Sequence, residues 1–472
     1  MTAHSSSRLA GTTFPSVLIL AAVLIFHLHL DSRIFGSSIL TLSALLGIRE
    51  IVNCIRNPSS SAIANGNVWV LASLLLIFCV SPMVRNLTNA QLPLVFARRD
   101  TETYMNQVNS LASIAILSTI LGSRILLQSR NEKGQVGFLQ PIRSFKPSIG
   151  VSIALFTFWI ALYFYWAITQ ENPFATIFGS RSSQRSFGVV KSNGYLVDSL
   201  YGALGVVTAW LAYSVRENNY RLTKKLLPVC LIFILPSFFQ GDRSKSIFFI
   251  VVISIILTGW NKKIKKSHVL IALILIPFIV VAPRVYRQSQ DLPSNISSAA
   301  FSVTNIVETF TKEDTAMAPT LAILLNNLGS NIPFQYGKSY LNLVVKPIPR
   351  TLWPGKPVEF DTQMMRVLFP TYAATGVGFA FSAISEPLVN FGLIGVVFFF
   401  VGIGILNRLN LERLTKGRSS AGVFLNAWLA GFMFVLIRGN LSVDFQRAVF
   451  PLMSGLIVLY FHDARTKKTH WL

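Results

Sequence analysis

The sequence predicts an all-α integral membrane protein with about twelve transmembrane helices and one large ordered extracytoplasmic loop. Two observations lead to this fold class. Charged residues make up only 13% of the 472 residues, whereas soluble proteins average about 25%, and the mean hydropathy is +0.54. Apolar stretches also recur along the chain at lengths close to the ~20 residues that cross ~30 Å of hydrocarbon as a helix.

The expected spans are the apolar stretches, taken in order along the chain. They are 14–30, 34–55, 67–84, 108–128, 148–169, 195–215, 226–240, 246–260, 268–282, 385–407, 421–437 and 447–461. They divide the chain into an N-terminal membrane region (1–282, about nine spans), a large loop (283–384) and a C-terminal membrane region (385–472, about three spans).

The formal net charge of +23 is distributed unevenly over the expected loops. With a cytoplasmic N-terminus, the inner segments contain 23 of the 42 Lys and Arg residues but only 5 of the 19 Asp and Glu residues. These segments are 1–13, 49–66, 124–147, 216–225, 261–267, 408–420 and 462–472. The positive-inside rule describes this pattern. The charge therefore predicts two cytoplasmic termini and contact with anionic membrane lipid, and it argues against a nucleic-acid partner.

The large loop is expected to be an ordered cap on the outer face, with weakly helical pieces at 296–312 and 316–328. It contains the segment PIPRTLWPGKP (347–357). Proline fixes φ near −65°, so Arg350 and Lys356 extend from a stiff strap. There they could bind a phosphate headgroup, Arg by its bidentate fork and Lys as a point charge. Trp353, followed by Pro354, suits the membrane interface. A rigid corner with anchoring side chains and no ligand explains the same residues.

Further cations border the expected spans on the outer side. In FFQGDRSKS (238–246), Arg243 and Lys245 lie at a tight turn before a helix whose N-terminus favours anions. Arg438 and Arg447 border the loop between the last two spans and could close a basic ring with Arg243 and Arg350. The alternative for each is an anchor at the membrane surface.

A glutamate opens the span that follows the large loop, in FAFSAISEPLVNFGLIGVVFFF (379–400). Ser385 is expected to cap this helix, and Glu386 in its first turn would complement the helix dipole. A carboxylate beside hydrocarbon is nevertheless a candidate functional group. Partial burial would make Glu386 a stronger base, suited to accept a proton.

Together these motifs resemble the bacterial oligosaccharide repeat-unit polymerases, the Wzy-type O-antigen polymerases. The resemblance covers roughly residues 230–450 and depends on three motifs, whereas the first half matches only in hydropathy. The matching residues are Gly241 and Arg243; Pro349, Arg350, Trp353, Pro354, Lys356 and Pro357; and Glu386, Pro387, Asn390, Phe391, Gly392 and Gly395.

The resemblance implies a glycosyltransferase of the bacterial inner membrane. Such enzymes transfer a growing chain from undecaprenyl diphosphate onto a new lipid-linked repeat unit, so donor and acceptor are both lipid-linked oligosaccharides. For this chemistry the candidate catalytic residues are Glu386, Arg243 and Arg350, and the candidates for binding the diphosphate are Lys356, Arg438, Lys245 and Arg447. Trp353, Pro354 and Asn390 would be structural or interface residues. A chain-length regulator and a flippase are candidate partners.

The alternatives are an O-antigen ligase and a flippase or transporter for polysaccharide lipids. Ligases resemble this architecture but carry a functional histidine in the large outer loop, and residues 283–384 contain no histidine. A transporter predicts polar residues in the middle of several spans, and few are present. The sequence also lacks HExxH, CxxC, P-loop and GxGxxG motifs, so we expect neither a metal nor a cofactor.

Overall fold

The described part of the chain is mainly helical. The computed structural model describes residues 33–56, 64–88, 95–96, 99–132, 147–170, 194–239, 243–258, 317–345, 353, 355–374, 378–417 and 419–460. The helices are α2 (Arg33–Arg56), α3 (Gly66–Leu75), the π-helix η2 (Leu76–Val80), α4 (Ser81–Thr88), α5 (Arg99–Glu132), α6 (Ile149–Ile168), α9 (Gly194–Arg216), α10 (Tyr220–Phe239), α11 (Arg243–Thr258), α14 (Met317–Asn327), α15 (Lys338–Val345), α16 (Phe360–Leu368), α17 (Pro370–Ala374), α18 (Ser385–Gly417), α19 (Ser420–Arg438) and α20 (Leu441–Tyr460).

The predicted all-α membrane protein is confirmed. Helices occupy ten of the twelve expected spans, and the other two (14–30 and 268–282) lie outside the described residues. Among the described residues, six helical stretches are long and apolar enough to cross a membrane. They are Ser37–Arg56, Gly66–Thr88, Thr103–Ile125, Ile149–Ile168, Ser385–Glu412 and Ser420–Arg438. The total of twelve spans stays a prediction.

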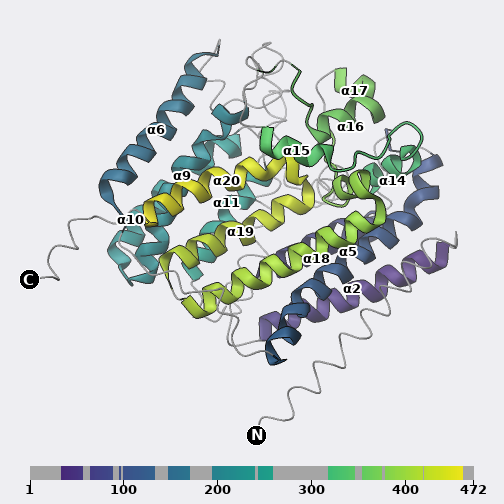
Figure 1. Ribbon diagram of the computed structural model, residues 1–472, viewed down its shortest axis with the longest axis horizontal. Helices are drawn as coiled ribbons and strands as arrows, with labels where there is room; N and C mark the ends of the chain where they lie inside the picture. Colours follow the sequence, from purple (N-terminus) through teal and green to yellow (C-terminus); the bar gives the residue numbers. More distant parts are fainter. Residues whose placement is uncertain are drawn as a thin grey trace, which may run out of the picture.

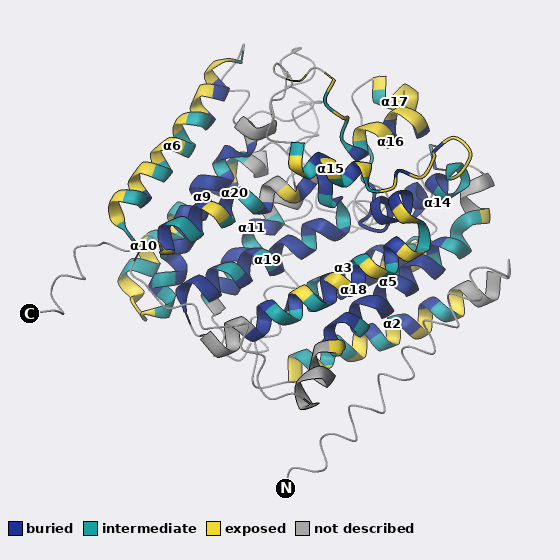
Figure 2. Cartoon of the chain, viewed as in Figure 1, coloured by how far each residue is buried: buried dark blue, intermediate teal, exposed yellow. Residues whose placement is uncertain are grey.

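Helix α19 lies at the centre of the bundle, and α6 lies at its edge (Figure 1). In its most apolar 18-residue window, 83% of α19 is buried inside the protein, against 22% of α6 (Figure 2). Trp428 of α19 is fully buried, with the rings of Phe248 and Phe424 at 5.3 and 6.3 Å. Its indole N–H donates to Thr208 Oγ1 at 3.0 Å. The C-terminus of this central helix therefore reaches the middle of one end of the bundle.

Helices α5 and α18 approach each other closely because glycines face the contact. A Cβ on Gly122 would lie 2.2 Å from the carbonyl oxygen of Val401, and a Cβ on Gly404 would lie 2.4 Å from that of Thr119. Small residues at helix contacts are typical of membrane bundles, where close packing replaces the hydrophobic effect as the driving force. This contact fixes α18, whose first turn carries Glu386.

The described part of the expected large loop folds over one end of the bundle (Figure 1). Its helices bury apolar side chains, and Phe360 and Met364 are fully inaccessible. Phe96, just before α5, contacts the rings of Phe369 and Phe379 with centroids 6.0 and 5.0 Å apart. We refer to residues 317–384, as far as they are described, as the cap.

Helix α14 confirms the helical piece expected at 316–328. The other expected piece, 296–312, lies outside the described residues. The position of the cap on the outer side of the membrane stays a prediction.

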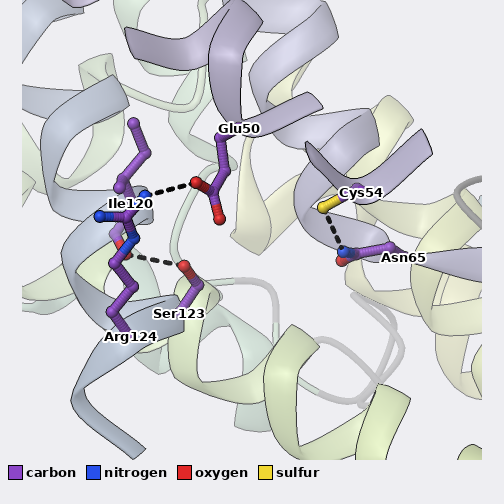
Figure 3. A network of polar contacts seen from close by, with 6 residues as sticks. All are labelled: Glu50, Cys54, Asn65, Ile120, Ser123 and Arg124. Atoms are coloured by element: carbon purple, nitrogen blue, oxygen red, sulfur yellow. Dashed lines mark hydrogen bonds and ion pairs between the residues drawn. The ribbon is translucent and has the colours of Figure 1, made fainter. Parts of the chain in front are cut away.

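A polar network joins α2, α3 and α5 near the other end of α5 (Figure 3). Arg124 donates to Glu50 Oε2 at 2.5 Å, and Asn65 Nδ2 donates to Cys54 Sγ at 3.2 Å. Such pairs satisfy polar groups that would be expensive to leave unpaired in hydrocarbon. The network thus holds the helix ends that the charge distribution predicts to be cytoplasmic.

Candidate functional site

The first turns of α18 are separated from the rest of the helix by a break. Phe391 (φ −137°, ψ 15°) and Gly392 (φ 65°, ψ −152°) have non-helical backbone angles. The carbonyl groups of Val389 and Asn390 are accordingly free to bind the cap, and they accept the N–H groups of Gln335 and Tyr336 at 2.9 and 3.0 Å. The span expected at 385–407 is therefore helical but broken at Phe391 and Gly392, where contacts with the cap replace part of the helical hydrogen bonding.

Gly392 has backbone angles that are open almost only to glycine. We therefore expect Gly392→Ala to destabilise the protein by about 1–3 kcal/mol, although a Cβ there would meet only ordinary contact with Phe334 at 3.7 Å. Gly402→Ala is the matched control, because Gly402 lies in the same helix and its Cβ would meet nothing within 4 Å. The measurement is thermal unfolding of both variants in detergent. Equal stability of the two would contradict the strained backbone.

Glu386 is buried and binds groups from two other helices. Its side chain is 1% exposed. Oε1 accepts the Ser339 hydroxyl of α15 at 2.8 Å, and Oε2 accepts the Ser442 backbone N–H at 3.2 Å. Ser442 is the second residue of α20, so the carboxylate lies at the N-terminus of α20, where a helix stabilises negative charge. Glu386 therefore joins the cap, α18 and α20.

Asn390 holds Ser339 and the cap in a fixed arrangement. Its Nδ2 donates to Ser339 Oγ at 2.7 Å and to the Glu386 carbonyl oxygen at 2.8 Å, and its Oδ1 accepts the Gly337 N–H at 2.8 Å. An amide nitrogen can only donate, so the Ser339 hydroxyl oxygen accepts a hydrogen bond from Asn390, and the hydroxyl donates its own hydrogen bond to Glu386. Asn390, Ser339 and Glu386 are all buried. The hydrogen bonds are therefore donated in sequence from Asn390 to Ser339 and from Ser339 to the Glu386 carboxylate.

Tyr340 forms an apolar wall beside this network. Its ring stacks on Phe391 with centroids 6.3 Å apart and an interplanar angle of 19°. Burial, and then the nearby charge of Glu386, raise the pKa of Tyr340 well above its ordinary range. Tyr340 therefore stays neutral beside the carboxylate.

Two expected cations lie in the described part of the chain near this network. Arg438 is the last residue of α19 and is half-buried. The Ala383 N–H donates to the carbonyl oxygen of Ile437 at 3.1 Å, so the C-terminus of α19 lies beside the start of α18. Lys356 is also half-buried, and its N–H closes a turn onto the Trp353 carbonyl oxygen at 3.1 Å. Lys356 thus belongs to the cap, and Arg438 ends a helix whose C-terminus lies beside the start of α18.

For the remaining expected site residues, either the whole residue or its side chain lies outside the described part of the chain. Arg350 and Pro354 lie outside the described residues. Helix α11 begins at Arg243, and α20 contains Arg447, but the side chains of Arg243, Lys245 and Arg447 are outside the described part. Their roles stay predictions.

The sequence missed Ser339 and Ser442, which the structure brings to Glu386. It also misjudged Ser385, whose buried hydroxyl has no hydrogen-bond partner among the described residues and so does not cap α18. Trp353 is 40% exposed, as an interface residue would be. Within the described ranges, no three His, Cys, Asp or Glu side chains are grouped to hold a metal ion.

Comparison with known proteins gives a match to a protein family. The model of a protein family described as O-antigen polysaccharide polymerase Wzy matches residues 16–469, nearly the whole chain. Neither the curated proteins nor the solved structures contain a match.

Proposed function

Because the chain belongs to the Wzy family of O-antigen polysaccharide polymerases, we propose that it polymerises undecaprenyl-diphosphate-linked oligosaccharide repeat units at the outer face of the bacterial inner membrane. The observation that carries the proposal is the extent of the match, which includes both the membrane helices and the cap. An acceptor hydroxyl oxygen would form the new bond to the sugar carbon. The bond from that carbon to undecaprenyl diphosphate would break, and the diphosphate would leave with the electron pair.

The proposed orientation places both termini in the cytoplasm and the cap outside. It is supported by the excess of Lys and Arg in the inner segments. A reporter enzyme fused after residue 266 should be active in the cytoplasm, and one fused after residue 340 should be active outside. The reverse result would place the cap on the wrong side for this reaction.

The proposed role of the cations is to stabilise the charge that develops on the diphosphate. Preorganised positive groups contribute most where charge appears in the transition state. In the proposed topology α11 and α19 run in opposite directions, so Arg243 at the start of one and Arg438 at the end of the other lie at the outer face. Arg350 and Lys356 would add to them from the strap, Lys245 from the first turn of α11 and Arg447 from the second turn of α20.

The proposed role of Glu386 is to accept the proton of the acceptor hydroxyl. Its support is a carboxylate held by Ser339, by Asn390 through Ser339, and by the N-terminus of α20. The acceptor hydroxyl would take the place of the Ser339 hydroxyl at Oε1. The same contacts support a second role, in which Glu386 only docks the cap on the bundle.

Deletion of the gene tests the function as a whole. Cells that lack a polymerase should make surface polysaccharide with a single repeat unit, seen on a gel as loss of the ladder while the first band remains. Loss of all lipid A-linked product would instead indicate a ligase. Loss of repeat units from the outer face would indicate a flippase.

A further inference from the structure

Helix α15 buries its polar side and exposes its apolar side, the reverse of a helix at a water-exposed surface. Its buried side carries polar residues, with Ser339 and Asn342 only 3% and 4% exposed. Its outward side carries Leu341 and Val344, which are 61% and 76% exposed. A surface helix in water points its apolar side chains at the protein and its polar ones at the solvent. The outward side of α15 is therefore suited to an apolar environment.

Both polar side chains on the buried side of α15 make hydrogen bonds within the protein. Ser339 binds Glu386 and Asn390, and Asn342 Nδ2 donates to the carbonyl oxygen of Val358 at 3.1 Å. These bonds fix the rotation of the helix, because turning it to bury Leu341 would break them. The exposure of the apolar side chains is thus a consequence of how the site is built.

The outward side of α15 continues into the exposed face of a membrane span. Tyr340 stacks on Phe391, and a Cβ on Gly337 would lie 3.2 Å from the Phe391 ring. From Phe391 the exposed face runs along α18 through Ile394 and Phe398, which are 67% and 73% exposed. Ile394 and Phe398 follow the break at Gly392 and are four residues apart, so they lie on one side of the helix. The stretch Ser385–Glu412 is apolar and long enough to cross the membrane, so this face meets lipid.

We propose that α15 lies in the membrane interface at this end of the bundle, with Leu341 and Val344 in contact with the acyl chains of the bilayer. Lys338 is exposed three residues before Leu341 on the same side, and its ammonium group extends toward the lipid headgroups. Amphipathic helices commonly lie ~5–10 Å into the boundary between headgroups and acyl chains. The proposal depends on the structure and not on the proposed reaction.

One consequence concerns the depth of the carboxylate. A helix that contacts acyl chains on one side and Glu386 on the other holds the carboxylate at the level of the headgroups. A diphosphate on a lipid carrier lies at the same level. The acceptor and the donor would therefore reach the site from the bilayer and not from bulk water.

Spin labels on single cysteines test the position of α15. Cys54, Cys79 and Cys230 are the only native cysteines and are first replaced by Ser or Ala. Labels are then placed at Leu341 and Val344, with Phe398 as the lipid reference and the exposed Thr362 of α16 as the aqueous reference. In phospholipid vesicles, accessibility to oxygen is compared with accessibility to a water-soluble nickel chelate.

We expect the labels at 341 and 344 to resemble the label at 398, with oxygen favoured over the nickel chelate. Values like those at 362 would place α15 in water and overturn the proposal. Low accessibility to both reagents would also overturn it, because protein would then cover the helix. Tyr336, 78% exposed just before α15, provides a third position should one of the labelled variants fold poorly.

Discussion

Replacement of Glu386 by Gln is expected to lower the polymer formed per enzyme by at least ~100-fold, because general-base assistance typically contributes ~10²–10⁴ in rate. Gln has nearly the same size as Glu, and its oxygen can still accept the Ser339 hydroxyl, which now lies 2.8 Å from Oε1. The substitution therefore removes basicity with little change in shape. The measurement is polymer formation by purified protein in lipid, supplied with a lipid-linked repeat unit. Turnover near normal would remove Glu386 from the mechanism.

Ser339→Ala separates the two roles of Glu386, because it removes the hydrogen bond between Ser339 and Glu386 and leaves the carboxylate in place. With Glu386 as the base, the alanine variant should keep most of the turnover that the glutamine variant loses. With Glu386 as a docking group only, the alanine variant should lose activity together with about 1–3 kcal/mol of stability, the usual effect of an unsatisfied buried group, whereas the glutamine variant, whose oxygen still accepts the Ser339 hydroxyl, should keep nearly normal turnover. Ser385→Ala is the matched control, since Ser385 is equally buried and its hydroxyl has no partner among the described residues.

Glu386 could be found from the sequence because it is a carboxylate at the start of a strongly apolar stretch, whereas Asn390 was named only through the family motif. A carboxylate in that position is expensive, so its presence alone indicates a function or a specific partner. Ser339 gave no such signal. It lies 47 residues before Glu386, in a segment without a motif, and only the docking of α15 brings the two together.

The break in α18 could also not be predicted from the sequence. Glycine is common in membrane helices, so Gly392 within an apolar run predicts a continuous span. The break exists because the N–H groups of Gln335 and Tyr336 occupy the carbonyl groups of Val389 and Asn390, and these partners come from another part of the chain. Composition and hydropathy thus predicted the helical membrane protein, whereas the site depends on contacts between the cap and the bundle.

The inverted polarity of α15 has the same origin. Residues 338–345 read KSYLNLVV, in which Leu341 and Val344 would ordinarily be assigned to the protein core. The structure points Ser339 and Asn342 inward instead, because Glu386 and the Val358 carbonyl oxygen need hydrogen-bond donors. Buried polar groups without partners are costly, and this cost decides which side of the helix faces the protein.

Arg243→Lys and Arg350→Lys are expected to lower polymer formation by about 10- to 100-fold each, although the charge is kept. Lysine lacks the planar fork that binds a phosphate through two parallel hydrogen bonds. A hydrogen bond to a charged group contributes about 1.5–3 kcal/mol, and about 1.4 kcal/mol corresponds to a factor of ten in rate. Arg366→Lys is the control, because Arg366 is an exposed arginine of the cap outside the proposed site.

The readout that identifies the role of these arginines is the split between kcat and KM, measured at equal protein level. Arginines that stabilise the leaving diphosphate act mainly in the transition state, so the lysine variants should lose kcat with little change in KM. Arginines that only anchor the helix ends at the membrane surface would leave both constants near normal, since lysine anchors equally well. Normal ladders from both lysine variants would therefore assign Arg243 and Arg350 to the membrane surface, and the diphosphate would have to be held by Lys356, Arg438 and the N-terminal turns of α11 and α20.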